Sequence, residues 1–133
     1  MNIIEHIGIA VKDLKQANNL YQSLLGIAPY KEELVASEFV KTSFFKVGKT
    51  KIELLQATQN NSPIANFINK KGEGIHHIAF EVKDIKNELK RLKAEGFTLI
   101  NKVPKRGADN RLVAFLHPKS ANGVLIELCQ NLL

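Results

Sequence analysis

Four residues in this chain of 133 combine reactive side chains with repeated positions, namely His6, Glu53, His77 and Glu127. Imidazole nitrogens and carboxylate oxygens bind borderline divalent ions such as Co, Ni, Zn and Mn, and a carboxylate also serves as a general base. Each glutamate interrupts an apolar run, where an unpaired charge is costly to bury. The residue types therefore indicate a metal site, or else structural residues such as a histidine at a strand end and a glutamate paired with Lys51.

The metal interpretation is favoured because both residue types recur in an internal repeat. Residues 5–15 match residues 76–86 at a histidine, an isoleucine, a valine, an aspartate and two lysines. Residues 51–55 match residues 125–129 in the same way. We therefore expect one domain over residues 1–133 that contains two modules, about 1–60 and 73–133.

Each module has the same predicted order of elements. A strand is followed by a helix with an aspartate N-cap, Asp13 or Asp84, and a glycine stop, Gly26 or Gly96. One apolar stripe, Leu14, Ala17, Tyr21, Leu24 and Leu25, is expected to pack the first helix. The predicted strands are 4–11, 28–34, 38–47 and 50–56 in the first module, then 76–82, 97–102, 111–117 and 123–130 in the second. A linker helix is expected over about 62–71, where Ser62 is the cap and Pro63 follows it.

These elements predict an α+β fold in which two paired βαβββ modules form a curved mixed sheet around a metal-binding cavity. Side chains alternate along a strand, so His6 shares a face with Gly8, and His77 shares one with Ala79. A pseudo-two-fold axis between the modules would bring both imidazoles and both carboxylates around one hollow. His76 faces the other way and His117 lies in a turn, so neither is predicted to be a ligand.

Composition and charge indicate which kinds of partner to expect. The formal charge is +6, but the lysines are spread along the whole chain without interleaved aromatics, so nucleic acid is not the expected partner. A small anionic substrate would benefit from the same positive field. No apolar run is long enough for a membrane helix, no signal peptide is evident, and a single cysteine suits the cytoplasm. We expect a cytoplasmic protein with no membrane association.

Several longer motifs resemble the vicinal oxygen chelate superfamily, which includes glyoxalase I, extradiol dioxygenases and methylmalonyl-CoA epimerases. The opening strand, His6-Ile7-Gly8-Ile9-Ala10-Val11, is typical of the superfamily as a whole. The segments 74–82, 114–120 and 123–129 are most similar to the epimerase branch. The resemblance covers nearly the full chain.

The resemblance implies an isomerase that interconverts the 2R and 2S forms of methylmalonyl-CoA through a metal-stabilised enolate. It implies a divalent ion (Co, Ni, Zn or Mn) on His6, Glu53, His77 and Glu127, with Glu127 both ligand and base. Glu53 is then the candidate opposite base. Lys119 and Ser120 are candidates to bind the carboxylate or phosphates of an acyl-CoA substrate, although an exposed turn explains them equally well. Members of the family are usually homodimers, which we expect here too.

Some alternatives stay open at the level of sequence. Some epimerases carry a second catalytic glutamate at a position that corresponds to Ser37, with Glu38 one residue along. A one-residue offset reverses the strand face, so Glu38 takes that role only if a bulge intervenes. Glyoxalase I would use the same four ligands on a glutathione hemithioacetal. A metal-free binding module of the same fold is the third possibility.

Overall fold

The computed structural model describes residues 1–132, which fold as two compact units. The first unit spans residues 6–76, and the second combines residues 1–5 with the chain from His77 onward. Each unit combines at least one α-helix with strands that pair both parallel and antiparallel, so the α+β class expected from the sequence is confirmed.

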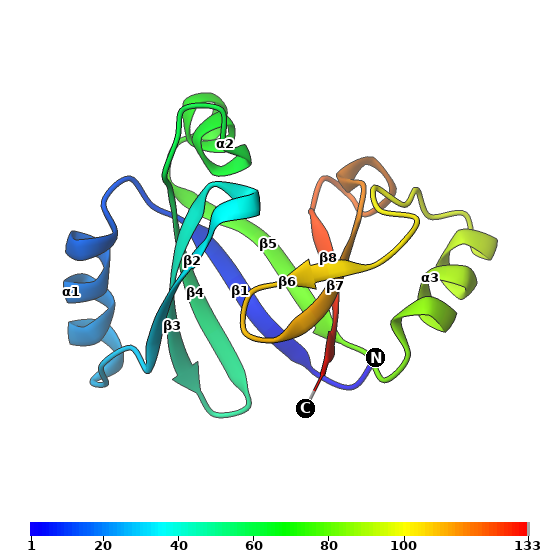
Figure 1. Cartoon of the computed structure of the whole chain (residues 1–133), viewed down its shortest axis with the longest axis horizontal. Helices are drawn as coiled ribbons and strands as arrows, with labels where there is room; N and C mark the ends of the chain where they lie inside the picture. The colour runs from blue at the N-terminus through cyan, green and yellow to red at the C-terminus, as the bar shows by residue number, and fades with distance from the viewer. Residues whose placement is uncertain (133) are drawn as a thin grey trace. The chain divides into compact units, whose positions relative to one another are not determined.

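The first unit contains strands β1 (Ile4–Ala10, its first two residues counted with the second unit), β2 (Lys31–Val35), β3 (Val40–Val47) and β4 (Thr50–Ala57). Strands β2, β3 and β4 pair antiparallel in that order, and β1 pairs parallel with β4. Helix α1 (Leu14–Leu25) makes the crossover from β1 and lies beside β3 and β4 (Figure 1). Helix α2 (Pro63–Lys71) follows β4 and packs against it.

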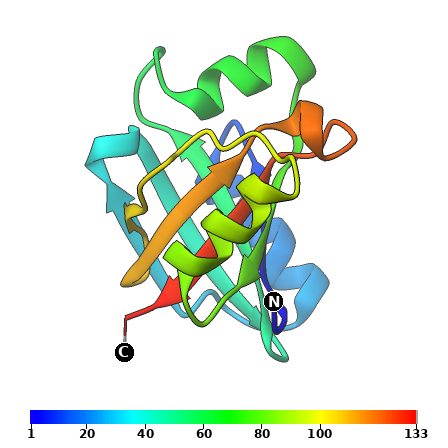
Figure 2. The same cartoon turned by 90° about the vertical axis from the view of Figure 1, so that its right-hand side faces the viewer.

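The second unit repeats this arrangement. Strand β5 (Gly74–Glu81) is followed by helix α3 (Ile85–Ala94), then β6 (Lys105–Gly107), β7 (Arg111–Leu116) and β8 (Ile126–Asn131). Strands β6, β7 and β8 pair antiparallel in that order, and β8 pairs parallel with β5. Helix α3 lies in front of β7 and β8 in Figure 2. The path from β5 through α3, β6 and β7 to β8 thus repeats the path from β1 through α1, β2 and β3 to β4.

Polar caps fix where the helices begin. The side chain of Asp13 accepts a hydrogen bond from the N–H of Gln16, and that of Asp84 accepts one from Asn87, so both predicted N-caps are confirmed. A second device was not predicted from the sequence. Gln56 in β4 accepts from the N–H of Leu14, and Gln130 in β8 accepts from that of Ile85. Each glutamine lies three residues after a candidate ligand and joins that strand to the start of a helix.

Helix α2 also begins with side-chain capping. The hydroxyl of Ser62 accepts a hydrogen bond from the N–H of Ile64 at 3.1 Å, and Pro63 takes the first helical position. The helix ends before Gly72, whose φ of 79° is a conformation that favours glycine.

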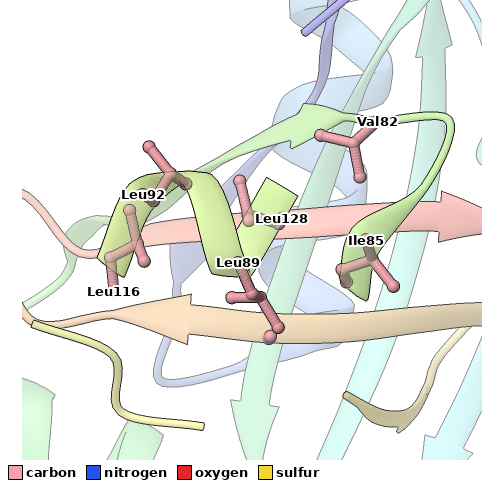
Figure 3. Packing of buried hydrophobic residues seen from close by; sticks show 7 residues of the cluster. Val82, Ile85, Leu89, Leu92, Leu116 and Leu128 are labelled. Atoms are coloured by element: carbon pink, nitrogen blue, oxygen red, sulfur yellow. The ribbon is translucent and has the colours of Figure 1, made fainter. Parts of the chain in front are cut away.

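Each unit has its own apolar core. In the second unit Val82, Ile85, Leu89, Leu92, Leu116 and Leu128 pack between α3 and the sheet (Figure 3). In the first unit Leu14 and Ala17 of α1 pack on Phe45 and Leu54, with Tyr21 and Leu25 at the edge. The predicted stripe was wrong at Leu24, which is 70% exposed. Positions 14, 17, 21 and 25 already complete the buried face at helical spacing.

One predicted strand is absent within the described residues. Residues 97–102 form only an isolated bridge, Leu99 to Leu116, and the ladder next to β7 is made by Lys105–Gly107 instead. Here the side chain of Asn101 accepts the hydrogen bond from the N–H of Phe115 that a strand would have accepted with a carbonyl. Pro104, which has no N–H to donate, further interrupts the ladder.

No helix among the described residues is long and apolar enough to cross a membrane.

The core of the second unit gives a direct stability test. Replacing Leu89, which is 3% exposed, with alanine leaves a cavity and should lower the free energy of unfolding by about 2–5 kcal/mol. Leu24→Ala, the same change at an exposed helical site, should alter it by less than about 0.5 kcal/mol. Urea denaturation measures both, and equal losses would contradict this packing.

Candidate metal and catalytic centre

The first unit pairs a buried imidazole with a buried carboxylate. His6 lies in β1 and Glu53 in β4, and the parallel register sets Gly8 beside Glu53. Nδ1 of His6 is 3.1 Å from Oε2 of Glu53, and both side chains are at most 4% exposed. Because Gly8 has no side chain, the histidine two residues before it can reach across to the glutamate.

The second unit holds the same pair at equivalent places. His77 lies in β5 and Glu127 in β8, and Ala79 stands beside Glu127. Nε2 of His77 is 3.1 Å from Oε1 of Glu127, and each side chain is 6% exposed. In both units the histidine precedes the small residue by two positions, so the same strand offset produces the same contact.

A phenylalanine lies opposite each glutamate, and sequence reasoning did not single out either. Phe44 of β3 is paired with Glu53, and Phe115 of β7 is paired with Glu127. The ring of Phe115 meets that of His77 edge to face, with centroids 5.9 Å apart. Both phenylalanines could have been identified from antiparallel pairing, because it places an apolar residue of the preceding strand beside each carboxylate. The ring of Phe115 therefore limits where the ring of His77 can turn.

The donor atoms suit a divalent metal ion. Two ligands at right angles around an ion, each bonded at about 2.1 Å, are about 3.0 Å apart. The observed nitrogen–oxygen separation of 3.1 Å in each unit is close to that value. A buried carboxylate also needs a positive partner, which either a protonated imidazole or a metal ion supplies. His6 with Glu53, and His77 with Glu127, could therefore each contribute two ligands.

The alternative base Glu38 does not lie in a regular strand. Residues Ala36–Glu38 form a short 3-10 helix between β2 and β3, and Phe39 follows with a φ of 52°. This turn interrupts the strand alternation, so a face cannot be assigned to Glu38 by counting residues back from Gly48. From the sequence, Glu38 was a candidate base only if the strand alternation was interrupted, and this 3-10 turn interrupts it.

The candidate substrate residues Lys119 and Ser120 lie in a second 3-10 helix, Pro118–Ser120. The hydroxyl of Ser120 donates to the carbonyl of His117 and accepts from the N–H of Thr98, while Lys119 is exposed. Nδ1 of His117 accepts from the N–H of Lys119. The ring of His76 packs edge to face on Phe67 of α2, with centroids 5.0 Å apart. His76 and His117 thus make contacts outside the two imidazole–carboxylate pairs.

A family model described as the glyoxalase/bleomycin resistance protein/dioxygenase superfamily matches residues 5–115. The chain belongs to this superfamily. The resemblance stated from the sequence is thereby confirmed at the level of the family.

Relatives include proteins with and without a known activity. Uncharacterized protein YqjC of Bacillus subtilis is 40% identical over 98% of this chain and 93% of its own length. The ethylmalonyl-CoA/methylmalonyl-CoA epimerase of Cereibacter sphaeroides is 41% identical over 96% of each chain. A Streptomyces coelicolor methylmalonyl-CoA epimerase variant with bound 2-nitronate-propionyl-CoA is 31% identical, with a TM-score of 0.94 over 98% of this chain and 94% of its own. The fold therefore matches that of solved epimerases.

The metal interpretation predicts a defined loss on removing one imidazole. His77→Ala should weaken Co²⁺ binding by more than about 100-fold, since the loss of even an outer partner costs 10- to 100-fold. The same change removes one partner of a buried ion pair, which costs about 3–5 kcal/mol. Because domains are ordinarily stable by about 5–15 kcal/mol, the chain should stay folded. Calorimetric titration with Co²⁺ and far-ultraviolet circular dichroism measure the two effects.

His117→Ala is the matched control, because His117 is exposed and its Nδ1 accepts a hydrogen bond within its own turn. It should bind Co²⁺ as the unmodified chain does. Equal affinities for all three proteins would contradict a metal site at His77.

Proposed function

We propose that this protein is a metal-dependent methylmalonyl-CoA epimerase. The observation that carries the proposal is the buried imidazole–carboxylate pair at the same strand positions in each unit. The relatives add weight, because they include methylmalonyl-CoA epimerases 36–42% identical to this chain.

In this proposal His6, Glu53, His77 and Glu127 hold one divalent ion, which is Co, Ni, Zn or Mn. A bound divalent ion supplies positive charge for the oxygens of the substrate, which acidifies the proton on C2 of the acyl group. The four side chains are those that the sequence repeat selects, two from each module.

Epimerisation needs a group on each face of C2, one to remove a proton and one to return it. We assign the removal and return to Glu127 and Glu53. A carboxylate oxygen of one residue accepts the C2 proton, and the other residue delivers a proton to the opposite face. Phe44 and Phe115 are each paired in register with one of these glutamates. Glu38 is the alternative second base.

The substrate is an acyl-CoA, as in the solved epimerase complexes with 2-nitronate-propionyl-CoA and with methylmalonyl-CoA. Lys119 and Ser120 are the proposed contacts to its carboxylate or phosphates. The hydroxyl of Ser120 already bonds within its turn, so the exposed ammonium of Lys119 carries most of this role. We further propose a homodimer that works in the cytoplasm.

The test is a comparison of two reactions on Co²⁺-loaded protein. In deuterium oxide, methylmalonyl-CoA should gain deuterium at C2 and lose optical purity, as followed by mass spectrometry and circular dichroism. The hemithioacetal of glutathione and methylglyoxal should give no lactoylglutathione. Lactoylglutathione formation without deuterium exchange would replace the proposal with glyoxalase I. Failure of the protein to bind Co²⁺, with neither reaction detected, would favour a metal-free binding module.

The two-base assignment makes a separate prediction. Glu127→Gln and Glu53→Gln retain size but lose the proton acceptor, so each should lower the epimerisation rate by about 10²- to 10⁴-fold. Each variant should still exchange the C2 proton of one stereoisomer, because one base is left. Stereospecific exchange is read from deuterium content in each isomer. Glu38→Gln is the control, and a loss of exchange in that variant equal to that in Glu53→Gln would transfer the role to Glu38.

A further inference from the structure

Two lysines, Lys51 and Lys46, lie beside His6 on neighbouring strands of the first unit, in one line across the sheet. The register places Lys51 of β4 beside His6, and Lys46 of β3 beside Lys51. Glu53 and Phe44 occupy the next row, so all five side chains project from the same face of the sheet. Lys51 is therefore two residues, or about 7 Å, from Glu53 along its strand.

Placing two lysines directly across an antiparallel pair has a cost. Like charges at such positions destabilise a sheet, because their Cβ atoms are only about 5 Å apart. A third lysine, Lys49, lies in the turn that joins the two strands, where Gly48 has a φ of 63°. Lys46 and Lys49 are both exposed. The end of this hairpin therefore concentrates positive charge beside a metal-ligand candidate.

The lysine pair occurs in only one copy of the internal repeat. Glu53 and Phe44 have equivalents in Glu127 and Phe115 of the second unit. At the position of Lys51, however, the second unit has Leu125, and at that of Lys46 it has His117. The catalytic candidates are thus kept in both copies, whereas the lysine pair occurs in one.

We infer that Lys46 and Lys51 bind phosphate groups of the CoA part of the substrate. The inference rests on the proposed function, because it takes an acyl-CoA as the ligand. Lysine binds phosphate as a mobile point charge, whereas a planar carboxylate is matched better by the arginine fork. A bound phosphate would also offset the repulsion between the two ammonium groups. The asymmetry of the repeat would then fix which unit receives the nucleotide end.

The experiment measures the affinity of Lys46→Gln by calorimetry for three ligands. Propionyl-CoA and methylmalonyl-CoA should each bind roughly two- to fivefold more weakly than to the unmodified chain, as expected for the loss of one solvent-exposed ion pair. Methylmalonyl-pantetheine, which lacks the nucleotide phosphates, should bind unchanged. An equal loss with methylmalonyl-pantetheine would overturn the inference, because it would assign the lysine to the carboxylate.

The thermal shift on ligand addition gives a second readout that a merely structural lysine would not produce. The same concentration of propionyl-CoA should raise Tm by less in Lys46→Gln than in the unmodified chain, because stabilisation by a ligand depends on its affinity. Lys41→Gln is the matched control, because Lys41 lies in the same strand on the opposite face and pairs with Glu32. It should leave all three affinities unchanged. Weaker CoA binding by both variants would indicate net charge alone and would overturn the inference.

The outcomes also separate this inference from the proposed function. Turnover of methylmalonyl-CoA with unchanged affinity in Lys46→Gln would refute the lysine site and leave the epimerase assignment intact. Phosphate-dependent binding that needs Lys46, without proton exchange at C2, would support the lysine site and refute the epimerase assignment.

Discussion

A carboxylate buried in the middle of a β-sheet must be compensated, and this requirement governs both units of the protein. Glu53 and Glu127 are flanked along their strands by apolar residues, yet both are almost completely buried. In each unit the compensation comes from an imidazole on the neighbouring parallel strand, 3.1 Å away. The contact depends on one register, in which a glycine or an alanine stands beside the glutamate and the histidine precedes it by two residues.

The rest of each unit maintains that register. Parallel pairing requires a crossover, and α1 and α3 provide it. The amides of Leu14 and Ile85, at the starts of these helices, are held by Gln56 and Gln130 of the glutamate-bearing strands. The glutamines thus join the helix start to the strand that bears the carboxylate. The apolar clusters between the helices and the strands stabilise the positions of these helices. Hydrophobic packing therefore supports the strands that bear the polar pairs.

Much of this could be predicted from the sequence because the decisive signals are local. Alternation along strands placed each histidine and glutamate on the face opposite its apolar neighbours, and aspartates marked the helix starts. The prediction of a strand at 97–102 was wrong because the side chain of Asn101 accepts a hydrogen bond that a strand would accept with a backbone carbonyl. That contact depends on tertiary position. The face of Glu38 could not be predicted, since the turn at 36–38 interrupts the alternation. Pairing across strands, which sets Phe44 and Lys46 beside their partners, is likewise invisible to a local pattern.

We propose that one ion is bound by both pairs together. The most direct test is a crystal structure of the Co²⁺-loaded protein with anomalous diffraction at the cobalt edge. The claim predicts one anomalous peak per chain, within about 2.0–2.2 Å of a donor atom from each of His6, Glu53, His77 and Glu127. Two separate peaks, one peak bonded to a single pair, or cobalt bound only elsewhere would contradict it.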